Sequence, residues 1–236
     1  MQKLMSRMRA ACEKYNMLED GDRIAVGVSG GKDSLSLLYG LSEMRRFYPA
    51  KYEVVAITLD PCFFGKDTDY SEIKKLCDKL GIEYHIKRTE LYKVIFENRK
   101  EKNPCSLCAR MRRGILHDTA KELGCNKLAL GHHMDDVSET FMMNLLSGGR
   151  LGAFRPVTYM SRKDIYVIRP MIFADEKEVE AAARHQQLPV VKSPCPMDKT
   201  SEREKIKQLL KELQKDYPAL NEKIVGAMQK DGIEGW

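Results

Sequence analysis

The chain has 236 residues, of which 43% are hydrophobic and 31% charged, enough for one large domain with its own core. No stretch approaches the roughly 20 apolar residues of a membrane span, and residues 1–11 lack the apolar segment of a secretion signal. The sequence therefore argues against a membrane protein and predicts a cytoplasmic one, whose seven cysteines are reduced thiols or metal ligands.

Hydrophobic periodicity predicts an amphipathic helix at 3–19, followed by alternating strands and helices. The strand patterns lie at 23–28, 52–59, 82–87, 127–130 and 166–168. The helical patterns between them lie at 32–46, 71–80, 105–123 and 135–147, and Gly81 and Gly124 end two of these helices. Short apolar strands that alternate with helices predict an α/β fold, in which helices cover both faces of a parallel sheet.

The pattern changes beyond Pro170. Three helices are predicted there, at 175–187, 201–216 and 219–230, with a short apolar segment at 188–191 after the first. We therefore expect a helical C-terminal part.

The hexapeptide SGGKDS at 29–34 follows a predicted buried strand and opens a predicted helix. Gly30 and Gly31 allow the backbone to approach a ligand, while the helix N-terminus and Lys32 direct positive charge at one point, which favours phosphate. The loop is not a Walker A motif, because that motif needs glycine where Val26 stands and Ser or Thr in place of Asp33. An ordinary strand–turn–helix corner is the alternative interpretation.

Two other polar segments also follow predicted strands, namely Asp60 and the run Gly131-His132-His133. Ligands of parallel α/β sheets bind outside the carboxyl ends of the strands, so these segments should meet SGGKDS there. A pair of structural histidines and a strand-end turn at Asp60 remain the alternatives. Arg169, before Pro170, either binds substrate or caps a strand.

The segment between Lys87 and Arg113 is basic. It contains nine Lys or Arg and three Glu, which gives a local charge of +6. Such a segment favours a polyanionic partner, nucleic acid first, although a solvated helix face would look the same. Its spacing does not place every arginine of the predicted helix on one face. The candidates for RNA contact are Arg99, Lys100, Lys102, Arg110, Arg112 and Arg113.

Cys105 and Cys108 form a C-x-x-C pair at the start of a predicted helix, whose N-terminus should lower their pKa values. Cys195, in a Pro-Cys-Pro turn, is the one other cysteine in a comparably rigid position. Three thiolates suit an iron–sulfur cluster with one iron lacking a protein ligand, while a zinc site and a redox dithiol stay open. Cys12, Cys77 and Cys125 are predicted core residues, and Cys62 is ambiguous.

These motifs occur in an order that resembles one known family. SGGKDS is the signature of the PP-loop ATP pyrophosphatases, and the chain further carries CSLCARMRRGIL at 105–116, LGHHMDD at 130–136, Arg169-Pro170 and Pro194-Cys195. Over about residues 20–230 it resembles the tRNA 2-thiocytidine synthetase family, one of the iron–sulfur-dependent tRNA thiolases. The chain is shorter than many relatives, and its third cysteine stands in Pro-Cys-Pro rather than a longer cysteine-bearing turn.

The resemblance implies ATP-dependent sulfur transfer to C2 of a cytidine in the tRNA anticodon loop, with AMP and pyrophosphate released. It implies a 4Fe–4S cluster on Cys105, Cys108 and Cys195, and a homodimer. The predicted organisation is then an N-terminal helix at 1–20, a PP-loop ATP-binding domain at 21–170 with the C-x-x-C, and a helical part at 171–236 with the third cysteine. The partners would be tRNA and a sulfur donor such as a cysteine desulfurase or sulfide.

The chemistry assigns a role to each group of residues. The C2 oxygen leaves well only after adenylation, so the loop would hold the departing pyrophosphate and Lys32 would offset its charge. Mg²⁺ normally accompanies ATP, with Asp33 or Asp135 as its ligands. The predicted catalytic residues are therefore Lys32, Asp33 and Asp135. The predicted ATP and pyrophosphate contacts are Ser29, Gly30, Gly31, Lys32, Asp33, Ser34, Asp60, Gly131 and His132.

Three other functions compete with this one. The same chemistry could act on a tRNA uridine or a free nucleobase. A lysidine-type ligase needs no cluster, so the three cysteines argue against it. A non-enzymatic ATP- and RNA-binding redox protein would bind ATP without forming AMP.

Overall fold

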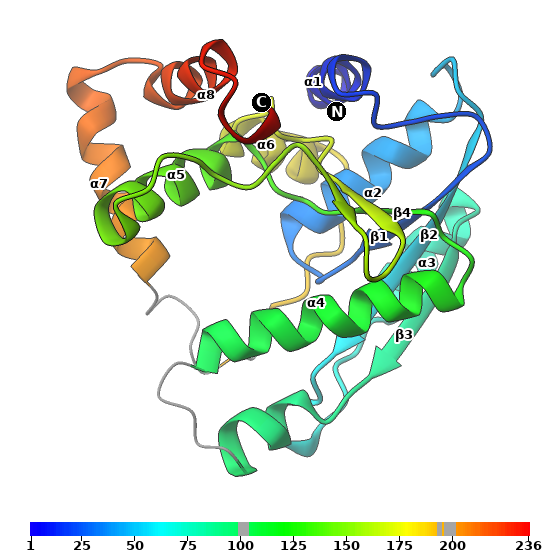
Figure 1. The fold of residues 1–236 in the computed structure, drawn as a ribbon. Helices are drawn as coiled ribbons and strands as arrows, with labels where there is room; N and C mark the ends of the chain where they lie inside the picture. The colour runs from blue at the N-terminus through cyan, green and yellow to red at the C-terminus, as the bar shows by residue number, and fades with distance from the viewer. Residues whose placement is uncertain (99–103, 193–194, 196–201) are drawn as a thin grey trace.

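A six-stranded sheet with the order β3-β2-β1-β4-β6-β5 forms the centre of the protein (Figure 1). We describe it from a computed structural model that covers residues 1–98, 104–192, 195 and 202–236. Five strands run parallel, as the sequence predicts, and the edge strand β5 is antiparallel to β6. The strands are β1 (Asp22–Gly27), β2 (Tyr52–Asp60), β3 (Glu83–Arg88), β4 (Lys127–Ala129), β5 (Val157–Met160) and β6 (Ile165–Ile168).

Strand β5 is not predicted from the sequence. This strand has only four residues, which are half-buried or exposed, so its hydrophobic alternation is weak. It is held instead by a hairpin with β6, in whose turn Asp164 has a φ of 47°. The sheet is therefore mixed rather than wholly parallel.

The helices lie between and after the strands as the periodicity predicts. They are α1 (Gln2–Lys14), α2 (Lys32–Met44), α3 (Ser71–Leu80), α4 (Pro104–Glu122), α5 (Met134–Gly148), α6 (Glu176–His185), α7 (Glu202–Asp216) and α8 (Leu220–Lys230). The N-terminal helix ends earlier than the expected residue 19, because Asn16 takes a left-handed backbone with a φ of 47°. A π-helical turn at Lys93–Asn98 and 3-10 turns at Phe63–Gly65 and Ile233–Gly235 are further unpredicted elements.

The two faces of the sheet carry separate cores. In β1, Ile24 and Val26 point into the larger core, which includes residues of α1, α2, α6 and α8. Ala25 points into the smaller core, where α4 contributes Ala120 and Leu116. Figure 1 shows α4 crossing one side of the sheet and α1, α2 and α6 on the other. The prediction of helices on both faces and of a helical C-terminal part is confirmed.

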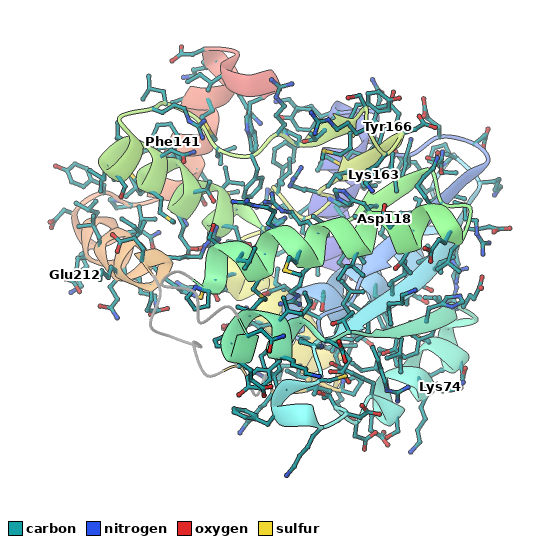
Figure 2. The ribbon with its side chains drawn as sticks, turned by 60° about the horizontal axis from the view of Figure 1, so that its bottom comes forward. Lys74, Asp118, Phe141, Lys163, Tyr166 and Glu212 are labelled. Carbon is teal, nitrogen blue, oxygen red and sulfur yellow. The ribbon has the colours of Figure 1, made fainter. Side chains whose placement is uncertain are left out.

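Polar contacts fasten α4 to the β5–β6 hairpin. Asp118 of α4 pairs with Lys163 of the hairpin turn (Figure 2). One helical turn later, Lys121 Nζ lies 3.2 Å from the Asp164 carboxylate. Because the C-x-x-C lies at the other end of α4, these contacts help to fix the position of the two cysteines.

The described residues include no helix long and apolar enough to cross a membrane. The larger core joins side chains from all three predicted segments, such as Leu4, Leu38 and Val225. The segment boundaries near residues 20 and 170 remain predictions.

Candidate nucleotide and iron–sulfur site

The SGGKDS loop connects β1 to α2 and is closed by its own serines. Ser34 Oγ accepts a hydrogen bond from the Ser29 backbone N–H at 3.1 Å and donates to the Gly31 carbonyl at 3.0 Å. Gly30 has a φ of +87°, and a Cβ there would lie 3.2 Å from the Cβ of Val191. Glycine is thus required both by the backbone conformation and by the close approach of the 188–192 segment.

The β4–α5 loop packs directly against SGGKDS, as expected for two loops at the carboxyl edge of the sheet. A Cβ at Gly131 would lie 3.1 Å from the backbone carbon of Asp33 and from the nitrogen of Ser34, so a larger residue would push the loops apart. The strands β1 and β4 are neighbours, and β1 leads outward to β2 while β4 leads to β6. Both loops therefore lie at the topological switch point.

His133 joins the carboxylates of both loops. Its Nε2 lies 3.8 Å from Asp33 and 3.5 Å from Asp136, and its Nδ1 lies 3.5 Å from Asp135. Burial disfavours the imidazolium, but the nearby Asp135 carboxylate and the charges of Asp136 and Asp33 raise the pKa of His133. The predicted Mg²⁺ ligands Asp33 and Asp135 thus face the same imidazole, although they belong to different loops.

Lys32 lies between two acidic side chains. Its Nζ is 2.8 Å from Asp33 Oδ1 and 3.2 Å from Glu176 Oε1. Burial opposes its charge, yet the Asp33 and Glu176 carboxylates raise the pKa of Lys32 above its ordinary value. The ammonium group is therefore charged at neutral pH at the N-terminus of α2.

Several residues of this site are not predicted from the sequence, and the C-terminal helices supply them. Glu176 opens α6 and donates its backbone N–H to Asp135 Oδ2 at 2.7 Å. Asn221 of α8 donates to Asp135 Oδ1 at 2.9 Å, and Arg203 of α7 lies 2.9 Å from Asp136 Oδ1. No local pattern marks these residues, because their partners lie far away in the sequence.

Glu139 gives this region a testable pH dependence. Burial, and then the charge of Asp136, raise the pKa of Glu139 to about 7. The folded state therefore keeps a proton on Glu139 at pH values where the unfolded state has lost it. The stabilisation from this group falls as pH rises from the lower pKa of the unfolded state to the raised pKa of the folded state. We expect the free energy of unfolding, measured by urea titration, to fall less between pH 5 and pH 7 in Glu139→Gln than in the wild type. Parallel curves for the two proteins would contradict this.

Asp60 is fully buried, and both of its carboxylate oxygens serve the loop that follows β2. They accept hydrogen bonds from the backbone N–H groups of Cys62 at 3.0 Å and Thr68 at 2.9 Å. This loop lines a hollow beside the SGGKDS loop. The hollow is bounded by Ser29, Leu59, Pro61, Phe63, Thr68, Tyr70, Arg112, Val191 and Lys192. A direct contact of Asp60 with nucleotide stays a prediction, while its neighbours Leu59 and Pro61 reach the hollow.

His132 and Arg169 lie beside the ring of Phe154. The His132 ring is 4.7 Å from the Phe154 ring, its Nδ1 has no hydrogen-bond partner among the described residues, and burial lowers the pKa of His132 to about 4. Arg169 Nη1 donates to the Arg155 carbonyl at 2.6 Å, and its guanidinium lies 4.9 Å from the ring centre. Burial, and then the charge of Arg113, lower the pKa of Arg169 to about 10. These contacts hold Arg169 against the segment that precedes β5, and its contact with substrate stays a prediction.

The three cysteines of the predicted cluster come from two distant segments. Cys105 is exposed and Cys108 half-buried in the first turn of α4, and Cys195 is half-buried. Burial raises the pKa of Cys108, the nearby Arg112 opposes this, and the charges of Cys195 and Cys105 raise it further. The expectation that the helix N-terminus lowers this pKa is wrong for Cys108, because burial outweighs it. Cys195 therefore lies near enough to Cys108 for its charge to act on that thiol, although the two belong to distant segments of the chain.

The sulfurs of Cys105, Cys108 and Cys195 are not all as close together as the ligands of a single zinc ion would be. A zinc ion with Zn–S bonds of about 2.3 Å holds its sulfurs about 3.8 Å apart. Among the described residues, the one trio whose ligand atoms lie within 4.8 Å of one another is Asp60, Cys62 and Asp67. The sulfurs of Cys105, Cys108 and Cys195 therefore do not all lie within that distance. The remaining cysteines Cys12, Cys77 and Cys125 are buried, as predicted.

Three arginines follow the C-x-x-C and face different ways. Arg112 lines the hollow together with Ser29, so it lies between the nucleotide loop and Cys108. Arg110 and Arg113 are exposed. Arg99, Lys100 and Lys102 lie outside the described residues. Elsewhere in the basic segment, Arg88 pairs with Asp67 at 2.7 Å and Lys87 with Glu122 at 3.8 Å.

The mostly parallel sheet, the glycine loop after its first strand and the acidic loop at the switch point define a PP-loop protein. The sequence matches the PP-loop domain family over residues 2–213. It is 40% identical over 229 residues to the tRNA-cytidine(32) 2-sulfurtransferase of Geobacter sulfurreducens, covering 96% of this chain and 88% of that protein. It is 42% identical over 217 residues to the enzyme of the same name from Syntrophotalea carbinolica, and this match covers 91% of this chain and 83% of that protein. The chain belongs to the tRNA-cytidine(32) 2-sulfurtransferase family, which confirms the resemblance.

Among solved structures, the U34-tRNA thiolase NcsA from Methanococcus maripaludis with its [4Fe-4S] cluster is similar, with a TM-score of 0.79 and 30% sequence identity. The match covers 98% of this chain and 80% of that one. The structural similarity to this thiolase thus includes the C-terminal helices of the chain.

Proposed function

We propose that this protein transfers sulfur to C2 of cytidine 32 in the tRNA anticodon loop, using ATP and a 4Fe–4S cluster. The observation that carries the proposal is the position of Arg112, which lines the hollow beside the SGGKDS loop and acts on the Cys108 thiol. One side chain thus spans an ATP site and a cysteine triad in a chain whose relatives are tRNA-cytidine(32) 2-sulfurtransferases. A lysidine-type ligase would have no use for this triad.

The first half of the reaction uses the carboxyl edge of the sheet. The cytidine C2 oxygen attacks the α-phosphorus of ATP, the bond to the β-phosphate oxygen breaks, and pyrophosphate leaves. The SGGKDS backbone and Lys32 bind the departing pyrophosphate, where negative charge develops. Asp33 and Asp135 are suited to hold Mg²⁺, and His133 fixes their positions.

The second half replaces the activated oxygen. A sulfide equivalent adds at C2, and AMP departs with the former C2 oxygen. Cys105, Cys108 and Cys195 would hold a 4Fe–4S cluster, and its iron without a protein ligand would supply a binding place for the sulfur. Arg112, which lines the hollow with Ser29 and acts on the Cys108 thiol, would contribute positive charge to this part of the site. The sulfur comes from a cysteine desulfurase or free sulfide, and the enzyme works as a homodimer.

Nucleoside analysis tests the assigned base. We expect tRNA from a strain that lacks the gene to lose 2-thiocytidine, with 2-thiouridines unchanged, when its nucleosides are measured by mass spectrometry. The wild-type gene should restore the nucleoside, and a Cys108→Ala gene should not. Loss of a 2-thiouridine with intact 2-thiocytidine would assign the enzyme to the U34-type reaction instead.

The basic segment provides a test of RNA docking. Anticodon-loop bases can be splayed out and read, and α4 presents the exposed Arg110 and Arg113 beside the cysteines. We expect charge reversal at Arg99, Lys100 and Lys102 to weaken tRNA binding and to flatten its salt dependence, because counterion release is lost. ATP binding and the iron content should not change. Filter binding at several salt concentrations, with Lys215→Glu as a control, measures the effect; unchanged tRNA affinity would place the RNA elsewhere.

A further inference from the structure

Helix α7 brings a second lysine to the nucleotide loop. Lys207 Nζ lies 2.8 Å from the carboxylate of Glu176, whose other partner is Lys32 at 3.2 Å. The side chains of Lys207, Glu176 and Lys32 are 27%, 21% and 28% exposed, so solvent screens this chain of charges only in part. Glu176 therefore lies between a lysine of the SGGKDS loop and a lysine of the C-terminal part.

The backbone of Glu176 is fixed where it stands. Glu176 is the first residue of α6, whose N-terminus is closed by the reciprocal hydrogen bonds of Asp175 and Glu178. Its backbone N–H donates to Asp135 Oδ2 at 2.7 Å. The carboxylate is thus held beside Lys32 by the fold, and its negative charge opposes any phosphate that approaches that lysine.

The charges around Lys32 explain why a second lysine is useful. Lys32 contacts two carboxylates, Asp33 and Glu176, which together more than balance its charge. The contact with Lys207 neutralises Glu176, and this contact also lowers the pKa of Glu176 although burial favours its protonated form. With Lys207 present, the cation of Lys32 remains available to an anionic ligand.

We propose that Lys207 is a positioning residue of the nucleotide site, which neutralises Glu176 so that Lys32 can bind the pyrophosphate part of ATP. This inference rests on the proposed function, because it deepens the role of the same loop. It also gives the C-terminal helices a part in the reaction. Arg203, one turn earlier on the same face of α7, pairs with Asp136 at 2.9 Å and with Glu139 at 3.4 Å, and so docks the helix on the acidic loop.

Affinity for Mg²⁺-ATP and for inorganic pyrophosphate, measured by calorimetry on the anaerobically purified full-length protein, tests the proposal. Lys207→Ala should bind both about tenfold more weakly, whereas Lys207→Arg should keep wild-type affinity. Lys205→Ala is the matched control, because Lys205 lies on the same helix but is 76% exposed and pairs with Glu202 at 3.2 Å. This control should bind both ligands as the wild type does.

A variant of the Glu176 carboxylate shows whether Lys207 acts through its charge or only through the folding of the protein. Glu176→Gln should bind pyrophosphate more tightly than the wild type, and the double variant Glu176→Gln with Lys207→Ala should recover wild-type affinity. Unchanged affinity of Lys207→Ala, or no recovery in the double variant, would overturn the proposal. If the wild type itself binds neither Mg²⁺-ATP nor pyrophosphate, the proposed function fails together with this role; if only the rescue fails, the proposed function stands.

Discussion

Cys108→Ala is expected to purify anaerobically without a brown chromophore and without iron, whereas we expect the wild type to carry about one 4Fe–4S cluster per chain. Cys108 is the half-buried member of the C-x-x-C, and the charges of both Cys195 and Cys105 act on it. Its loss leaves two thiolates, too few to hold four irons. Absorption spectroscopy and iron analysis measure the effect, and tRNA thiolation should vanish with the cluster.

Cys12→Ala is the control for this experiment. Cys12 is fully buried in α1 within the larger core, and burial raises its pKa so that it stays a thiol. Its variant should keep the chromophore. Replacement of Cys105 or Cys195 should behave as Cys108→Ala does. Stoichiometric zinc without iron in the anaerobic wild type would overturn the cluster and favour a structural metal site.

The second large effect is expected at Lys32. Lys32→Ala should slow tRNA thiolation on the order of 10²-fold or more, because the charge that offsets the departing pyrophosphate is lost. ATP consumed by the wild type should appear as AMP and pyrophosphate, in step with thiolated tRNA. Chromatography of the nucleotides together with a pyrophosphate assay measures both quantities.

Lys215→Ala serves as the control for Lys32→Ala. Lys215 is 68% exposed and pairs with Glu212 one turn earlier on α7, and we assign it no role in ligand binding. Its variant should keep the wild-type rate. ADP and orthophosphate as the coupled products would exclude the PP-loop reaction, whatever the rate of Lys32→Ala.

Local structure that depends on residues close together in the sequence is predicted correctly. The strand, the two glycines and the helix start of 29–34 are contiguous, so local propensity and backbone sterics decide their shape. The same holds for the helix ends at Gly81 and Gly124, which take the left-handed conformation with φ values of 62° and 71°. The pairing of SGGKDS with the loop at Gly131 followed from a general rule for parallel sheets.

Local helix rules were less reliable for electrostatics. The start of α4 suggested a lowered thiol pKa, yet Cys108 is half-buried and its pKa is raised. The spacing of the arginines showed that they do not share one face, but not that Arg112 is the one that lines the hollow beside Ser29. Burial depends on what packs against a helix, and a helix pattern does not contain that information.

The sequence by itself determined the phosphate loop, the alternation of strands and helices and the three candidate cluster cysteines, because each depends on residues within a turn or two. Only the tertiary structure decided that Cys195 lies near enough to Cys108 to act on its thiol. It also decided that the Asp60 carboxylate accepts hydrogen bonds from its own loop, and that Glu176 lies between Lys32 and Lys207. Lys32 and Glu176 are 144 residues apart, and Arg203 and Asp136 are 67 apart. Contacts over such separations are set by how the helices pack on the sheet, and they leave no periodic trace in the sequence.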